Sequence, residues 1–174
     1  DDFRVSKLQA ILLYEADFNH NNKHIGRDMM YFTEDLKIIA PEQYGSCKHH
    51  TAIDHGLNKQ LTFDFLKLKR QSGVLCANNA KACYNWIVHL VASLAMQSQG
   101  VPLGPIVCMF TTIQKLKHYV QTIYGDSSLF FGGTLWMVPI QGVGQGNGTG
   151  PQIWVVVSTI ILNMMQAEGH TCFF

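Results

Sequence analysis

The sequence predicts an α+β (mixed α/β) domain whose helices pack against one mixed sheet. Two observations lead to this class. Apolar residues recur at helical spacing in several segments, and runs rich in β-branched and aromatic residues, bounded by turn residues, lie between those segments. The length of 174 residues suits one domain with a hydrophobic core, and a content of 47% hydrophobic residues argues against a disordered chain.

The N-terminal part of the chain predicts a strand, a turn and a helix in that order. Residues 8–14 form a short apolar run typical of a buried strand, and residues 19–22 form a turn-rich break. Apolar residues at helical spacing then run over residues 25–38. Pro41 ends this helix because it cannot donate a backbone hydrogen bond, and residues 42–50 form a polar loop.

An amphipathic helix is predicted from Thr51 onward. Its apolar positions follow one another at steps of four, four, four and three, and Gly73 closes it. We expect a short central strand at residues 74–76, followed by a helix over residues 84–95 that stops at residues 100–102. The apolar face of the helix that begins after Thr51 consists of Ile53, Leu57, Leu61, Phe65 and Leu68.

The next segments predict one further helix and three strands. The helix covers residues 106–116. Two strands are expected at residues 118–124 and 129–131, separated by a turn at residues 125–127, and a third at residues 134–140. Helices and strands therefore interleave along the chain, as the predicted fold class requires.

A glycine-rich loop, QGVGQGNGTGP, leads into the last predicted helix. Alternating glycines suggest a backbone that approaches another group closely, such as a phosphate at a helix N-terminus. The dinucleotide fingerprint fails because Asn147, Thr149 or Pro151 stands where its third glycine belongs, and the P-loop fails because Pro151 replaces its lysine. The loop either approaches a ligand or is purely structural. Pro151 begins a helix, although the residues after it are β-branched.

Charge and cysteine content narrow the setting of the protein without naming a partner. A net charge of +1 leaves no electrostatic footprint for nucleic acid or membrane. The five cysteines show no CxxC pair, so we expect reduced thiols in a cytoplasmic or nuclear protein that is not secreted. No apolar tract reaches the roughly 20 residues of a membrane-spanning helix, so we expect no membrane contact. Two clusters of basic residues are more typical of solvated helix faces than of a surface that binds phosphates. They are Lys59, Lys67, Lys69 and Arg70, and Lys115, Lys117 and His118.

Four segments carry motifs in a fixed order. LQAILL with NNKHIGRDMM comes first, then EQYGSCKHHTAID, NAKACYN and GVGQGNGTGPQIW. NAKACYN aligns without a gap with the pattern Asp-x-x-x-Ala-Phe/Tyr-Asp, and GVGQGNGTGP aligns with Gly-Val-Pro-Gln-Gly-x-x-x-Gly-Pro. Together they resemble the reverse transcriptase (RNA-directed DNA polymerase) domain of the non-LTR retroelement type. The resemblance covers nearly the whole chain, with motif A at residues 79–85 and motif B at residues 142–151.

The resemblance implies a polymerase fingers and palm architecture. Residues 1–73 would be a fingers-like segment, and residues 74–174 a partial palm that ends before the motif C hairpin. It implies nucleotidyl transfer by two Mg²⁺ ions, with an RNA/DNA primer–template and a dNTP as partners, in a retroelement polyprotein. The implied site residues are Asn79 and Asn85 as catalytic positions, Asn79 and the backbone of Ala80 as metal ligands, and Ala80, Lys81, Tyr84, Gln145 and Gly146 as nucleotide contacts.

Several positions depart from the family pattern. Asn79 and Asn85 stand where motif A has aspartate, Cys47 and His50 where the second motif has arginine, and Gln9 where the first has arginine. Mg²⁺ prefers anionic oxygen, so losing one such charge predicts a rate loss of at least about 10³. The resemblance therefore predicts an inactive polymerase fragment.

Two other readings stay open. In the first, the chain is a non-catalytic remnant of a retroelement protein that binds nucleic acid or a partner protein of the same retroelement. The arginines lost from the motifs weaken the affinity for phosphate in this case. A nucleotide-binding enzyme of another family rests only on the glycine-rich loop.

Overall fold

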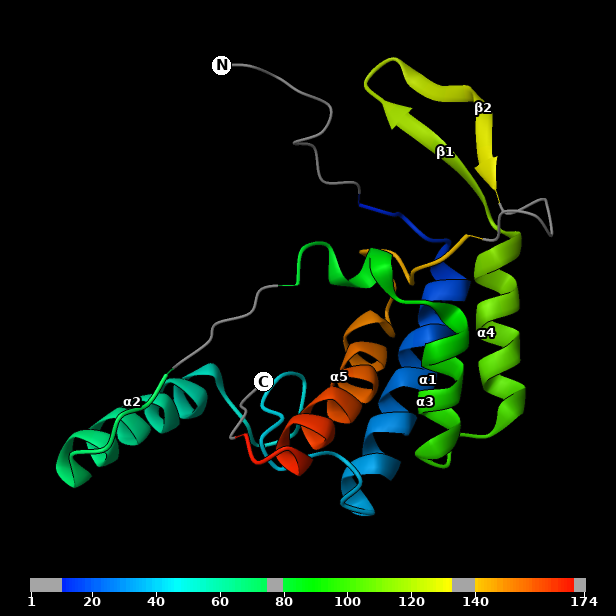
Figure 1. Cartoon of the computed structure of the whole chain (residues 1–174). Coiled ribbons are helices and arrows are strands. Elements are labelled where there is room, and N and C mark those ends of the chain that lie inside the picture. The colour runs from blue at the N-terminus through cyan, green and yellow to red at the C-terminus, as the bar shows by residue number, and fades with distance from the viewer. Residues whose placement is uncertain (1–10, 75–79, 133–139, 171–174) are drawn as a thin grey trace.

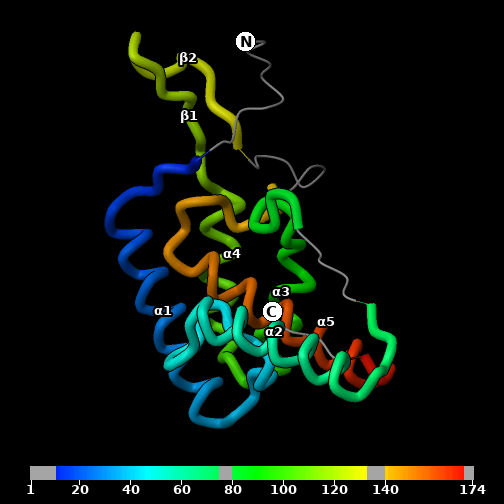
Figure 2. The backbone as a smooth tube through the Cα atoms, turned by 90° about the vertical axis from the view of Figure 1, so that its left-hand side faces the viewer, coloured from blue at the N-terminus to red at the C-terminus, as the bar shows by residue number. Residues whose placement is uncertain are grey.

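Four helices lie side by side and form the body of the protein (Figures 1 and 2). The computed structural model describes residues 11–74, 80–132 and 140–170. The four helices are α1 (Ala16–Asp35), α3 (His89–Ser98), α4 (Leu103–Lys115) and α5 (Gly150–Ala167). Helix α5 packs against α1 and α3, and α3 packs against α4. The class is therefore α+β, with helices dominant in the described part of the chain.

The hydrophobic core lies where these four helices meet. Met29 of α1 belongs to the same core as the buried residues of α3, α4 and α5, so the predicted fingers-like and palm segments share one core. Spacing of three and four along α4 turns one face inward, as the periodicity of residues 106–116 predicts. The most deeply buried core side chains include Met96, Ile106, Met109, Ile113, Ile153 and Val156.

Helix α1 begins earlier than the sequence predicts and runs through the expected turn at residues 19–22. The prediction of a turn there is wrong because tertiary contacts override the low helix propensity of the asparagines. Asn22 is buried and donates a hydrogen bond to Asn147, and Asn19 accepts one from the backbone of Gly148. The helix ends at Asp35, so Ile38 lies outside it.

Helix α2 (Ala52–Lys69) confirms the predicted helix but not a role in the core. Thr51 and Asp54 form a capping box, and Arg70 ends the helix in a left-handed conformation with φ of 50°, three residues before Gly73. The helix projects away from the four-helix body (Figure 1). None of its residues is buried, and its apolar face is open to solvent, with Ile53 80% and Leu68 81% exposed.

The sheet of the described residues is a two-stranded antiparallel hairpin, not the predicted mixed sheet packed with helices. Strand β1 (Lys117–Thr122) pairs with β2 (Gly125–Gly132), and the hairpin extends beyond the end of α4 (Figure 1). The chain reverses at Ile123 and Tyr124, before the expected turn at residues 125–127. Gly125 carries a φ of +113° at this reversal, which explains why the turn precedes the Asp-Ser pair.

The predicted helix over residues 84–95 is divided in two. A short 3₁₀ helix, η2 (Cys83–Trp86), is separated from α3 by the extended residues Ile87 and Val88. The break has a clear cause, since the carbonyl of Ile87 accepts a hydrogen bond from Gly142 instead of an intrahelical donor. In contrast, α5 is one continuous helix with proline in its first turn, as predicted.

The remaining strand predictions fall partly outside the described residues. Residues 11–14 have no regular structure, so the strand predicted at residues 8–14 is not formed there, although Leu12 makes one strand-like hydrogen bond. Val74 has no regular structure either and is exposed. The rest of the strands predicted at residues 74–76 and 134–140 lies outside the described residues, except for Ile140. No helix among the described residues is long and apolar enough to cross a membrane.

Candidate functional site

The structure brings the described part of motif A into direct contact with motif B. The backbone amide of Val143 donates to the carbonyl of Tyr84 at 2.9 Å, and that of Gly142 donates to the carbonyl of Ile87 at 2.8 Å. Motif B is a loop without regular structure whose last residues enter α5, and motif A runs into η2. Two segments far apart in the sequence therefore form one backbone-paired unit.

Glycines make this contact possible. Gly142 has φ of +84°, and a Cβ placed on it would lie 2.7 Å from the carbonyl oxygen of Asn85. Gly146 has φ of +117°, and a Cβ there would overlap the carbonyl of Leu12. The close approach that the alternating glycines predict is thus met within the chain, on both sides of the loop.

Residues before α1 hold the other side of the glycine-rich loop. The amide of Leu12 donates to the carbonyl of Gln145 at 2.8 Å, and the hydroxyl of Tyr14 donates to the carbonyl of Val143 at 2.9 Å. Burial raises the pKa of Tyr14 to about 12, so its hydroxyl keeps its proton and remains a donor. Sequence reasoning missed Tyr14 because a tyrosine at the end of an apolar run carries no sign of a distant partner.

A buried polar network fixes the end of the loop against α1. The side-chain oxygen of Asn147 accepts from Asn22 at 3.1 Å, from the amide of Thr149 at 3.0 Å and from its hydroxyl at 2.9 Å. This triple acceptor role orders the turn into α5. The side-chain nitrogen of Asn147 is buried and has no hydrogen-bond partner within the described residues.

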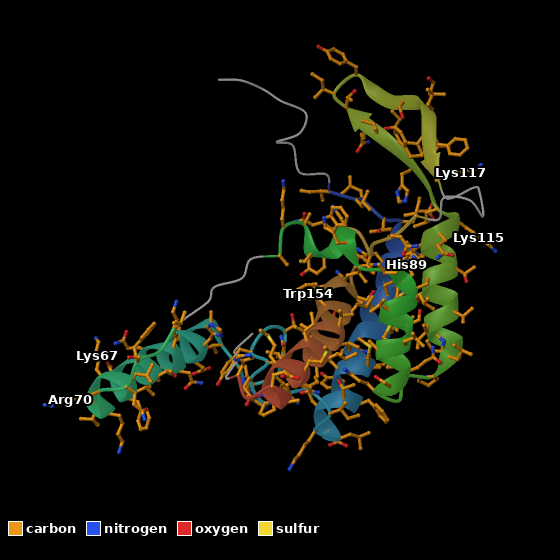
Figure 3. The ribbon with its side chains drawn as sticks, viewed as in Figure 1. Lys67, Arg70, His89, Lys115, Lys117 and Trp154 are labelled. Carbon is orange, nitrogen blue, oxygen red and sulfur yellow. The ribbon has the colours of Figure 1, made fainter. Side chains whose placement is uncertain are left out.

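His89 links three elements of the site. Its backbone amide donates to the side-chain oxygen of Gln141 at 2.9 Å, and its Nε2 lies 2.6 Å from the carbonyl of Gly142. A carbonyl only accepts, so Nε2 carries the proton and Nδ1 accepts from Gln114 of α4, at 3.1 Å. Burial lowers the pKa of His89, and the hydrogen bond to Gly142 opposes this shift. Figure 3 labels this residue at the start of α3.

The predicted site residues of motif A differ in how far their side chains are buried. Tyr84 is half-buried against the core beside Gly150, and burial raises its pKa, with Cys83 adding to the effect. Lys81 is exposed in a turn next to Ala80. Asn85 is exposed at the side chain, while its backbone contacts Gly142. Asn79 and Gln9 lie outside the described residues.

A cavity of about 350 Å³ opens beside motif A. Ala80 and Lys81 line it together with residues of η2, α3 and α5, and its walls are mainly apolar. Trp154, labelled in Figure 3, contributes from α5, and the largely exposed Trp86 also lines the cavity. Gln145 and Gly146 do not line this cavity, so it does not bring together all the predicted nucleotide contacts.

The donor set around the two motifs does not fit Mg²⁺. Between Asp64 and Glu168 the sequence contains one carboxylate, Asp126, and it lies near the turn of the hairpin. No group of three or more His, Cys, Asp or Glu side chains that could hold a metal occurs in the parts of the chain that the structure describes. Magnesium is held by oxygen ligands that include carboxylates. The amide of Asn85 offers only a neutral oxygen.

The two basic clusters lie at opposite ends of the molecule. Lys67 and Arg70 stand at the end of α2, whereas Lys115 and Lys117 stand where α4 leads into β1 (Figure 3). Lys117 also sits over the ring of Phe130, with 4.8 Å between the ammonium nitrogen and the ring centroid. The two basic clusters therefore do not form one continuous surface for a nucleic-acid backbone.

Comparison with known proteins identifies no relative. No protein-family model, no curated protein and no solved structure matches the chain.

Proposed function

We propose that this chain is of reverse transcriptase type and contacts a primer–template or nucleotide at motifs A and B without catalysing nucleotidyl transfer. One observation supports the proposal above the others: motif A and motif B, which the family resemblance places at one site, are paired backbone to backbone through Tyr84 and Val143. Nothing in the local sequence of either segment requires that contact.

The chemistry of the site supports a binding role in preference to catalysis. Two-metal phosphoryl transfer needs anionic ligands to hold both ions, and Asp126 is the single carboxylate between Asp64 and Glu168. Lys81 is exposed beside the cavity and supplies a cation for a phosphate. Tyr84 and Gln145 take part in the backbone pairing around the glycine-rich loop, because the carbonyl of Tyr84 accepts from Val143 and that of Gln145 accepts from Leu12.

Binding to labelled primer–template tests this role. Fluorescence anisotropy of an RNA template annealed to a DNA primer would be measured against salt concentration for the native chain and for Lys81→Ala. Loss of one phosphate contact would lower the slope of log K against log salt by about one. Lys67→Ala, in the distant basic cluster, is the matched control and should leave the slope unchanged. Binding that depends on Lys67 and not on Lys81, or no binding at low salt, would refute the proposal.

The partner-binding remnant is the second candidate, and the open face of α2 favours it. This face carries a continuous apolar stripe of Leu57, Leu61 and Phe65. Each of these residues is more than half exposed. Exposed apolar patches of this kind mark interaction surfaces. Co-purification with another protein encoded by the same retroelement would be measured for two variants. If Leu61→Glu abolished it while Lys81→Ala did not, the partner-binding role would replace the nucleic-acid-binding role.

A further inference from the structure

Two histidines on α1 face each other through their ring nitrogens. His20 and His24 are one helical turn apart, and their Nε2 atoms lie 3.0 Å from each other, with 4.5 Å between the ring centroids. The continuous helix creates this arrangement, because residues four apart share a face only where the chain is helical. A turn at residues 19–22 would not align them.

The separation of the two nitrogens matches the bite of a metal ion. Metal–imidazole bonds are about 2.0–2.1 Å long, so two ligands at a right angle are about 2.9 Å apart and two at a tetrahedral angle about 3.4 Å. The observed 3.0 Å lies near the right-angle value. Square-planar and tetragonal coordination, typical of Cu²⁺ and Ni²⁺, uses right angles.

Arg27 sets the resting state of the pair. Its Nη2 lies 2.7 Å from Nδ1 of His24, and arginine can only donate, so this nitrogen accepts. The proton of a neutral His24 is then on Nε2, between the two rings. To bind a metal, Nε2 of His24 loses that proton and Nδ1 takes one up, which breaks the contact with Arg27 and releases no net proton.

We propose that His20 and His24 bind one divalent late transition-metal ion of the Cu²⁺ and Ni²⁺ type through both Nε2 atoms. His20 is exposed and His24 half-buried, so the ion can enter from solvent without a change in the fold. Within the described ranges no third His, Cys, Asp or Glu completes the group, so water or an added ligand fills the other positions. Imidazole ligands also separate this site chemically from the Mg²⁺ implied for motif A.

Calorimetric titration with Ni²⁺ tests the site on the whole chain. Ni²⁺ is the preferred probe because Cu²⁺ would react with the free thiols, which include Cys47, Cys83 and Cys108. His20→Ala and His24→Ala should each weaken binding about a hundredfold, because the second nitrogen binds at the high effective concentration of an intramolecular ligand. Arg27→Ala should strengthen binding severalfold, since it removes a positive charge and the competing hydrogen bond.

A matched control separates this pair from the other histidines. His49→Ala with His50→Ala removes two histidines of the polar loop and should leave the Ni²⁺ affinity unchanged. Circular dichroism would verify that the helices of every variant are intact. An affinity that is the same in His20→Ala, His24→Ala and the native chain would overturn the proposal, as would one lost only in the loop variant.

Discussion

The imidazole Nε2 of His89 lies 2.6 Å from the carbonyl oxygen of Gly142. This contact joins the first residue of α3 to the glycine-rich loop, and Gln114 of α4 completes the hydrogen bonds of the ring. A buried, neutral and fully bonded histidine acts here as a structural link between motif B and the helices behind it.

His89→Ala should lower the free energy of unfolding by about 1–3 kcal/mol. The substitution leaves the buried carbonyl of Gly142 and the amide of Gln114 without their partner, and an unsatisfied buried polar group costs that much. Urea denaturation followed by circular dichroism would measure the change. His170→Ala, at an exposed position after α5, should stay within about 0.5 kcal/mol of the native chain. Equal effects of the two substitutions would contradict the assigned link.

Stability should fall as the pH drops below about 6.5, the usual pKa of an unfolded histidine. Burial lowers the pKa of His89 in the folded chain, so between the two pKa values the unfolded chain binds more protons than the folded one. The stabilisation is complete above this range and decreases as the pH falls through it. His118, whose pKa burial also lowers, adds to the same trend.

The pH dependence can be assigned by comparing variants. Unfolding free energies of the native chain and of His89→Gln would be measured between pH 7.5 and pH 5 in steps. The slope should be smaller in His89→Gln and smaller again when His118→Asn is added. A slope that is the same in all three chains would show that other groups cause the dependence.

Gly142→Ala and Gly56→Ala should change stability in opposite directions. At Gly142 a Cβ would meet the carbonyl of Asn85 at 2.7 Å and φ is +84°, so alanine should cost about 1–3 kcal/mol. At Gly56, inside α2, a Cβ meets nothing within 4 Å, and alanine should favour the helix by about 0.5–1 kcal/mol. Chemical denaturation and helical content would measure both. A harmless Gly142→Ala would mean that the two motifs do not pack as closely as described.

Periodicity predicted the helices whose apolar spacing is regular. The spacing around Ile106 and Ile113 predicted α4, and Pro151 marked the first turn of α5 against the preference of its valines. Where the sequence prediction failed, a distant polar partner decided the outcome. Asn22 stays helical because Asn147 accepts its hydrogen bond, a contact across the chain that no local pattern encodes.

The candidate site was predictable only in part. The resemblance named both motifs, and the structure pairs Tyr84 of one with Val143 of the other. It could not name Tyr14 or His89, which hold the loop from opposite sides, because a single tyrosine or histidine in an apolar segment has no characteristic spacing. The exposure of Leu57 and Phe65 was unpredictable for a similar reason, since an apolar stripe shows that a helix has a face but not what covers it.

Asn79→Asp should not restore primer extension. The substitution supplies one carboxylate at the motif A position, but two-metal transfer needs at least one more anionic ligand beside it. Asp126 is the single carboxylate between Asp64 and Glu168, and it belongs to the hairpin beyond α4. A primer–template incubated with dNTPs and Mg²⁺ should therefore show no added nucleotides on a sequencing gel. A known active reverse transcriptase on the same substrate serves as the positive control. Template-dependent extension by Asn79→Asp would mean that an acidic group outside this stretch reaches motif A, and the assignment of a non-catalytic site would then fail.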